Sequence, residues 1–211
     1  MKPDHVTAFF KALQKQNPNP EGELYYTNPY TLLVAVTLSA QATDVSVNKA
    51  TEKLFKIVTT PADMLKLGED KLKNHIKTIG LFNSKAKNLI AMAKILVDQY
   101  DGDIPRTRDE LTALPGVGRK TANVVLNIAF DEPTIAVDTH LFRVCNRTKL
   151  ATGKTPLAVE QKLEKIIPVS FKKNAHIWLI LHGRYTCTAR APKCGACAVF
   201  DLCRFKDKIK A

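Results

Sequence analysis

Four cysteines near the C-terminal end of the sequence follow the pattern C-x6-C-x2-C-x5-C. Four thiolates can bind one tetrahedral zinc ion or a four-iron cluster, and the spacing by itself does not choose between these two. Disulfides rank third, because the N-terminal sequence has no apolar export signal and a reducing cytoplasm is the expected compartment. The candidate ligands are Cys187, Cys194, Cys197 and Cys203. The remaining cysteine, Cys145, is expected to be a buried apolar residue.

A second chemical pattern is the turn Pro115-Gly116-Val117-Gly118, between one helix expected to end at Leu114 and another expected at 119–130. Its two glycines allow positive φ and present no Cβ, so the turn can lie flat against a nucleic-acid backbone. The free N–H groups of the turn and of the next helix's first residues are expected to point outward, where the helix dipole favours a bound phosphate. A tight connection between packed helices is the structural alternative.

Lys120 is a candidate nucleophile at the start of that second helix, off its apolar face. Beside Arg119 and the positive end of the helix, its ammonium group lies in an unfavourable field, which we expect to lower its pKa from the reference of about 10.4. A neutral lysine amine is a nucleophile. The commoner alternative is a solvated lysine that contacts a phosphate.

Asp138 follows the apolar segment 134–137 and precedes an expected helix over 139–149. An aspartate in this position predicts an N-cap, and capping alone is a sufficient reason for it. A carboxylate close to DNA could also stabilise a cationic sugar or accept a proton from an amine.

The charge of the sequence points to a polyanionic partner. Lysine and arginine number 32 against 20 aspartates and glutamates, which gives a net charge of +12 and a pI near 9.5. Nucleic acid is therefore the leading partner. No segment approaches the roughly 20 apolar residues of a membrane span, so no membrane association is expected.

The elements that must position these residues read as helices throughout, with no strand pattern. Asn28-Pro29, Thr60-Pro61 and Thr155-Pro156 each predict a cap followed by a first-turn proline, and Thr107 to Glu110 predicts a capping box. A segment at 76–86 loosely echoes 111–122, which supports a second helical hairpin. The expected helices are 4–16, 29–40, 44–58, 61–67, 69–78, 84–100, 107–113, 119–130, 139–149, 156–167 and 172–185.

Three stretches of the sequence resemble one known family. LPGVGRKTANVVLN looks like a helix-hairpin-helix DNA-binding motif, and it is followed by PTIAVDTHLFRVCNR and then by the cysteine pattern after HGRYTC. Together they resemble the endonuclease III family, in the helix-hairpin-helix, Gly/Pro-rich, aspartate superfamily of DNA glycosylases. LLVAVTLSAQATDVSVNKAT and IKTIGLFNSKAKNL extend the resemblance over about residues 22–206.

The resemblance implies an all-α fold of two domains. One is a continuous six-helix domain over 22–132, with the helix-hairpin-helix at about 107–130. The other combines 1–21 with 133–211 and carries an iron–sulfur cluster loop. Lys120 and Asp138 would face each other across the cleft between the domains, and the cysteine spacing would hold a [4Fe–4S] cluster.

The resemblance also implies a bifunctional enzyme of base-excision repair. Lys120 would attack the sugar carbon that bears the damaged base, expel the base, and form a Schiff base from which β-elimination cuts the strand 3′ to the abasic site. Asp138 would assist the lysine and stabilise the sugar cation. The substrates would be damaged pyrimidines and abasic sites in double-stranded DNA, bound by a monomer in the cytoplasm, on the nucleoid if the source is bacterial.

Further contacts are implied by position in the family's segments. Gln41 and Leu81 would fill the gap left by a flipped nucleotide, although without the resemblance Gln41 reads as a surface residue and Leu81 as a core residue. Ser39, Asp44 and His140 would line the lesion pocket, with Asp44 as an N-cap the alternative. The other DNA contacts would be Gly116, Val117, Gly118, Arg119, Thr121, Arg190 and Lys193.

Two rival functions remain at this point. A non-catalytic DNA-binding module would keep the hairpin and the cysteines but need neither Lys120 nor Asp138. A monofunctional glycosylase would use water in place of a lysine. Borohydride trapping on damaged DNA separates both rivals from a Schiff-base enzyme.

Overall fold

The computed structural model describes residues 1–209, and within them it contains eleven α-helices, one π-helical turn, one 3-10 turn and no β-strand. The predicted all-α fold class is therefore confirmed. The helices are α1 (Pro3–Gln16), α2 (Pro29–Leu38), α3 (Asp44–Leu54), α4 (Pro61–Leu67), α5 (Glu69–Ile76), α6 (Phe82–Tyr100), α7 (Arg108–Ala113), α8 (Arg119–Phe130), α9 (Thr139–Thr148), α10 (Pro156–Ile166) and α11 (Val169–Leu181), followed by the π-helical turn η1 (His182–Thr186) and the 3-10 turn η2 (Cys194–Ala196).

The chain divides into two compact units, Glu23–Asp131 and a second made from Met1–Gly22 with Glu132–Ala211. Each unit has its own hydrophobic core. The boundaries differ by one residue from those expected from the sequence. The assignment of the units to separate functional domains stays a prediction.

Helix α2 is the centre of the unit 23–131. Residues Tyr30 to Leu38 are all buried, because α8, α3 and α6 pack around this helix. A helix that is apolar on every side belongs in a core, which accounts for the most apolar stretch of the sequence. None of the helices in residues 1–209 combines the length and the apolar character that crossing a membrane requires.

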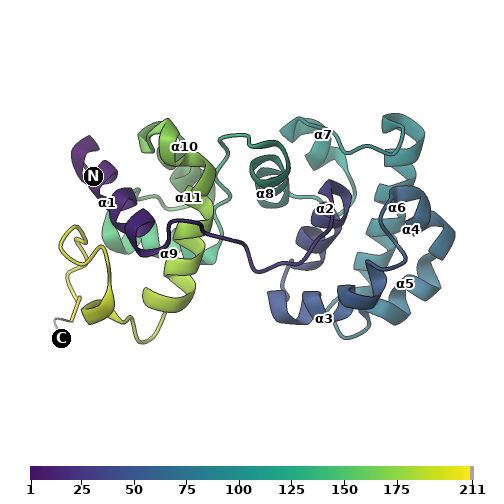
Figure 1. The fold of residues 1–211 in the computed structure, drawn as a ribbon, viewed down its shortest axis with the longest axis horizontal. Helices are drawn as coiled ribbons and strands as arrows, with labels where there is room; N and C mark the ends of the chain where they lie inside the picture. Colours follow the sequence, from purple (N-terminus) through teal and green to yellow (C-terminus); the bar gives the residue numbers. More distant parts are fainter. Residues whose placement is uncertain (210–211) are drawn as a thin grey trace. The chain divides into compact units, whose positions relative to one another are not determined.

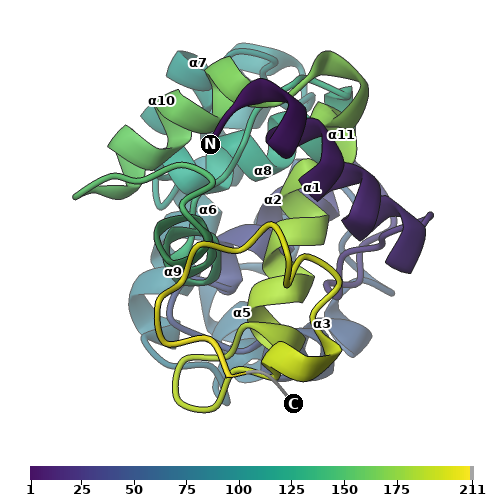
Figure 2. The ribbon, with the colours of Figure 1, turned by 90° about the vertical axis from the view of Figure 1, so that its left-hand side faces the viewer.

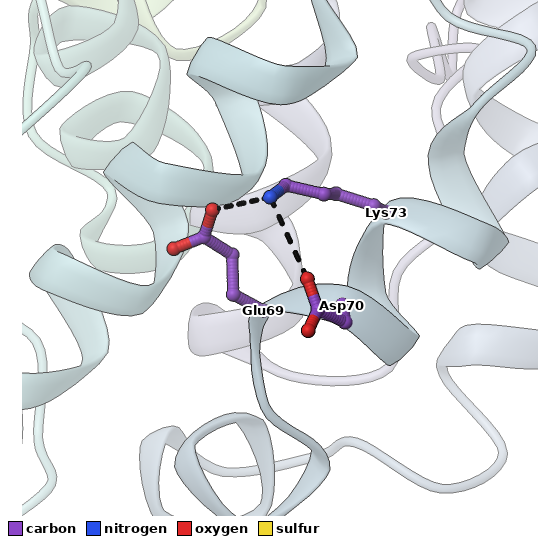
Figure 3. A network of polar contacts seen from close by, with 3 residues as sticks. All are labelled: Glu69, Asp70 and Lys73. Atoms are coloured by element: carbon purple, nitrogen blue, oxygen red, sulfur yellow. Dashed lines mark ion pairs between the residues drawn. The ribbon is translucent and has the colours of Figure 1, made fainter.

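Helices α4 and α5 pack against the long helix α6 (Figure 1), and α7 packs against α8. The unit has seven helices, as in the list of expected ranges, although the resemblance implied a six-helix domain. Gly68, at φ 79°, both ends α4 and precedes α5. On the surface of α5, Lys73 pairs with Glu69 at 2.6 Å and with Asp70 at 3.7 Å (Figure 3). Exposed pairs of this kind contribute little to stability.

Helix starts follow the predicted caps. Asn28 and Thr60 each form a capping box with the residue three positions later, and Thr155 accepts the N–H of Ala158. The box predicted at Thr107 is only half correct. Its hydroxyl accepts the Glu110 N–H, but the Glu110 carboxylate accepts from that same hydroxyl at 2.5 Å and not from a backbone N–H.

Aromatic side chains hold the two segments of the other unit together, residues 1–22 and residues from 132 onward. Helix α1 lies against α11 (Figure 2), with the ring of Phe10 stacked 5.8 Å from that of Phe171. The indole of Trp178 donates to the carbonyl of Asn17 at 2.8 Å. Residues 1–22 are thus joined to a helix far along the sequence. The helix expected over 172–185 ends at Leu181, and the chain continues as the π-helical turn η1.

Candidate functional site

The turn between α7 and α8 is held by one backbone hydrogen bond, from the N–H of Val117 to the carbonyl of Leu114 at 3.1 Å. Gly116 adopts φ 79°, and a Cβ there would lie 3.1 Å from the Cβ of Asn88 on α6. The positive φ favours glycine at this position, and the close approach leaves little room for a side chain.

Of the two glycines that allow positive φ, Gly116 adopts it, whereas Gly118 has φ −93° and is the N-cap residue of α8. A Cβ at Gly118 would meet nothing within 4 Å. The absence of a side chain at Gly118 therefore leaves open space in front of the first turn of α8. Val117 is 6% exposed and its N–H is used within the turn. The Val117 N–H is therefore not one of the free N–H groups of the turn.

Helix α8 begins without a side-chain cap. The first N–H groups of a helix have no acceptor inside it, so this end can receive an anion. Arg119 and Lys120 are exposed here, whereas the side chain of Thr121 is 7% exposed and begins the buried face. The prediction that Lys120 lies off the apolar face of its helix is confirmed.

Asp138 is the N-cap of α9, as predicted, and its Oδ1 accepts the Leu141 N–H at 2.8 Å. The buried residues Ile135 to Val137 anchor the chain immediately before it. The carboxylate is half-buried, and its second oxygen accepts no hydrogen bond from residues 1–209. The cap hydrogen bond thus fixes one of the two carboxylate oxygens.

Helix α9 also holds the cysteine loop. Arg143 donates through Nε to the Cys187 carbonyl at 3.0 Å and through Nη2 to the Gly183 carbonyl at 2.7 Å. Arg147 donates to the carbonyls of Thr188 and Ala189, both at 2.6 Å. The sequence analysis missed both arginines. Their spacing of one helical turn, in a helix that precedes a cysteine cluster, was the available signal.

Gly183 permits the close approach that these bonds need, because a Cβ there would lie 2.8 Å from the Cβ of His140. His140 itself is half-buried, with Nδ1 3.3 Å from Nη2 of Arg143. His140, which the resemblance placed in the lesion pocket, therefore also takes part in the contact between α9 and η1.

The four cysteines line one cavity of about 360 Å³, counted with the space at its open side. None of the four forms a disulfide. Nη1 of Arg147 lies 3.8 Å from the Cys187 sulfur, and Nε2 of His182 lies 3.7 Å from that of Cys197. Four thiols with cationic and N–H neighbours suit an anionic thiolate-bound group.

Across residues 1–209, no three side chains of His, Cys, Asp or Glu gather at the spacing that one metal ion needs. Cys145, by contrast, is fully buried in the core, as predicted. In the loop from Cys187 to Cys194, the side chains of Arg190 and Lys193 are exposed.

Gln41 and Leu81 share an unusual backbone conformation, with φ 56° and φ 61°. Both are exposed, Leu81 by 62%, so the interpretation of Leu81 as a core residue is wrong and that of Gln41 as a surface residue is confirmed. A left-handed conformation in a non-glycine residue costs on the order of 1–3 kcal/mol and persists only where the surroundings impose it.

The remaining pocket candidates lie near Gln41. The hydroxyl of Ser39, which caps the C-terminal end of α2, donates to the Val36 carbonyl at 2.8 Å. Asp44 is the first residue of α3, and the cap is Thr43, which accepts the Ser46 N–H. The alternative that made Asp44 the N-cap is therefore wrong.

Comparison with known proteins identifies the family that combines such a hairpin, a helix-capping aspartate and a cysteine loop. Residues 34–169 match the family model of the HhH-GPD superfamily of base excision DNA repair proteins, and residues 187–203 match the iron–sulfur binding domain of endonuclease III. The chain belongs to the endonuclease III family of that superfamily. It is a base-excision repair enzyme, a DNA glycosylase and abasic-site lyase, and it carries a [4Fe–4S] cluster.

Similar proteins span nearly the same length. The chain is 60% identical to endonuclease III of Escherichia coli K12 over 93% of both chains, and 55% identical to that of Rickettsia conorii over 100% of both. Among solved structures, it resembles a trapped endonuclease III–DNA covalent intermediate with a TM-score of 0.90 and 43% identity, covering 97% of this chain and 96% of the other.

Proposed function

We propose that the protein removes oxidised, ring-saturated or fragmented pyrimidines from duplex DNA and then cuts the strand 3′ to the abasic site through a lysine Schiff base. The observation that carries this proposal is the exposed amine of Lys120 at the uncapped start of α8, directly after the Gly116–Gly118 turn. The protein would act as a monomer, since one lesion needs one site, on DNA in the cytoplasm or nucleoid.

Lys120 is the proposed nucleophile. Its nitrogen bonds to the sugar C1′ as the bond from C1′ to the base breaks, and the base leaves with a proton. The sugar ring opens to an imine between C1′ and the lysine. Loss of a C2′ proton then breaks the C3′–O bond and releases the 3′ strand, and water finally hydrolyses the imine and regenerates the amine.

Asp138 is the proposed partner at the same nucleotide. The Leu141 N–H holds its Oδ1, which fixes the orientation of the carboxylate. The other oxygen would accept the proton that the lysine amine loses on attack and would stabilise positive charge on the sugar.

DNA is bound largely through its backbone in this proposal. The segment Gly116 to Thr121 grips a phosphate through N–H groups at the start of α8 and through the Arg119 side chain, with Val117 as core support. Gln41 and Leu81 enter the gap left by the extruded nucleotide. Ser39, Asp44 and His140 line the pocket for the lesion, and Arg190 and Lys193 contact the backbone from the cysteine loop.

Cys187, Cys194, Cys197 and Cys203 are the proposed cluster ligands. These four cysteines, on binding the cluster, would hold in place the loop that presents Arg190 and Lys193. Arg143 and Arg147 tie that loop to α9, whose first turn is capped by Asp138. The proposed role of the cluster is therefore to position residues against DNA.

The test is borohydride trapping of the purified protein on a duplex that contains one thymine glycol. We expect a covalent adduct from the wild type and from Lys94→Gln, an exposed lysine on α6, and none from Lys120→Gln. Undiminished trapping by Lys120→Gln would reject Lys120 as the nucleophile. Excision without any adduct from the wild type would favour a monofunctional glycosylase, and no excision would favour a DNA-binding module.

A further inference from the structure

Lys85, in the first turn of α6, is a lysine inside the core of the unit 23–131. Its side chain is 7% exposed, and its Nζ donates to the Leu38 carbonyl at 2.9 Å. This is its one polar side-chain partner within residues 1–209. Burial lowers the pKa of the Lys85 ammonium, because removal from water disfavours its charged form.

An apolar side chain would fill this position without the desolvation cost of a buried ammonium. The hydrogen bond to the Leu38 carbonyl is therefore the reason we consider for a lysine here. In a continuing α2 helix, the Ala42 N–H would donate to the Leu38 carbonyl. It donates instead to Ser39 at 3.1 Å. The Lys85 ammonium takes the released carbonyl, at the helix end where the dipole favours a cation. The chain can then turn, and Gln41 adopts its positive φ three residues later.

Lys85 also forms a backbone hydrogen bond at the start of α6. The backbone N–H of Lys85 donates to the Leu81 carbonyl at 3.0 Å, and Leu81 is the residue with positive φ that precedes this helix. One side-chain bond and one backbone bond of Lys85 therefore reach the two segments that carry Gln41 and Leu81.

We propose that Lys85 is a positioning residue, whose buried ammonium holds the end of α2 against the start of α6 and so fixes Gln41 relative to Leu81 for filling the gap beside an extruded nucleotide. This inference rests on the proposed function, in which these two residues enter the DNA. Lys85 does not touch the substrate, and its effect is confined to steps that need both residues in place.

The matched variants are Lys85→Met, which keeps the length of the side chain without the ammonium, and Lys87→Met, an exposed lysine on the same helix. Each is compared on two substrates under single-turnover conditions: thymine glycol in duplex DNA, which requires gap filling, and an abasic site in single-stranded DNA, which does not. We expect Lys85→Met to slow excision from the duplex by about tenfold or more, as misplaced groups do, with cutting of the single strand within about twofold. Lys87→Met should change neither rate.

A second readout follows gap filling itself. In the Lys120→Gln background, 2-aminopurine opposite the lesion reports unstacking when side chains enter the helix, and adding Lys85→Met should remove most of that fluorescence change. Lys85→Arg, which keeps a charged donor, should restore much of the duplex rate. If Lys85→Met does not fold, Lys85→Gln carries the same comparisons with the same expected directions.

The positioning role would be overturned if Lys85→Met lost the same factor in rate on both substrates. It would also be overturned if Lys85→Met left the 2-aminopurine fluorescence change of the Lys120→Gln parent unaltered. Failure of the proposed function looks different, because the wild type itself would then leave both substrates uncut.

Discussion

At the scale of single residues, Asp138 has a structural task and, in the proposed mechanism, a chemical task, on separate oxygens. Oδ1 caps α9 through the Leu141 N–H, while the proposed chemistry uses the other oxygen. The two tasks respond differently to substitution, because an asparagine keeps the carbonyl-type acceptor for the cap but not the negative charge.

We therefore expect Asp138→Asn to leave the free energy of unfolding nearly unchanged and to lower the single-turnover excision rate by about 10²–10⁴. Asp138→Ala should lose the same activity and in addition about 1 kcal/mol of stability, because the cap is gone. Urea unfolding and excision kinetics measure the two effects separately. Asp138→Asn with wild-type kinetics would leave the carboxylate a cap and nothing more.

At the scale of elements, the hairpin uses its two glycines for different reasons. Gly116 has a positive φ and a neighbour at 3.1 Å, whereas Gly118 has an ordinary φ and open space. We expect Gly116→Ala to destabilise the protein by about 1–3 kcal/mol. Gly118→Ala should stay within about 0.5 kcal/mol of the wild type yet weaken binding to undamaged duplex, since its methyl group stands before the helix end.

Thermal unfolding and a DNA-binding titration distinguish the two variants. If Gly118→Ala bound DNA as tightly as the wild type, the start of α8 would not be a phosphate site. The interpretation of Gly116 as a strained, enclosed position would be rejected if Gly116→Ala were as stable as the wild type.

Elements also show what the sequence could predict. Proline after a cap residue marked three helix starts correctly, because both signals are local. Leu81 was misjudged from apolarity alone, since nothing in its side chain encodes a positive φ that the surrounding fold imposes. The same limit hid Arg143, Arg147 and Lys85, whose acceptors are carbonyls distant in the sequence. The roles assigned to the site residues by resemblance stay predictions.

At the scale of the whole molecule, the net charge of +12 leads us to expect that DNA affinity depends strongly on salt concentration. Each phosphate contact releases counterions and adds about 0.9 to the slope of log affinity against log salt. We expect binding to undamaged duplex to weaken steeply with salt. The double variant Arg190→Gln/Lys193→Gln should reduce the slope by about 1.8, and Lys94→Gln should leave it unchanged. Equal slopes for the double variant and the wild type would remove the cysteine loop from the DNA contacts.

The discontinuous unit has a consequence for synthesis on the ribosome. The contact between Asn17 and Trp178 joins residues 161 positions apart, so α1 emerges long before its partner helix exists. At roughly 5–20 residues per second, α1 waits on the order of 10–30 s with its aromatic side chains uncovered. Residues 23–131, which have their own core, can fold during that interval. The unit that holds the cysteines therefore closes last, and delivery of iron and sulfur has to follow translation of nearly the entire chain.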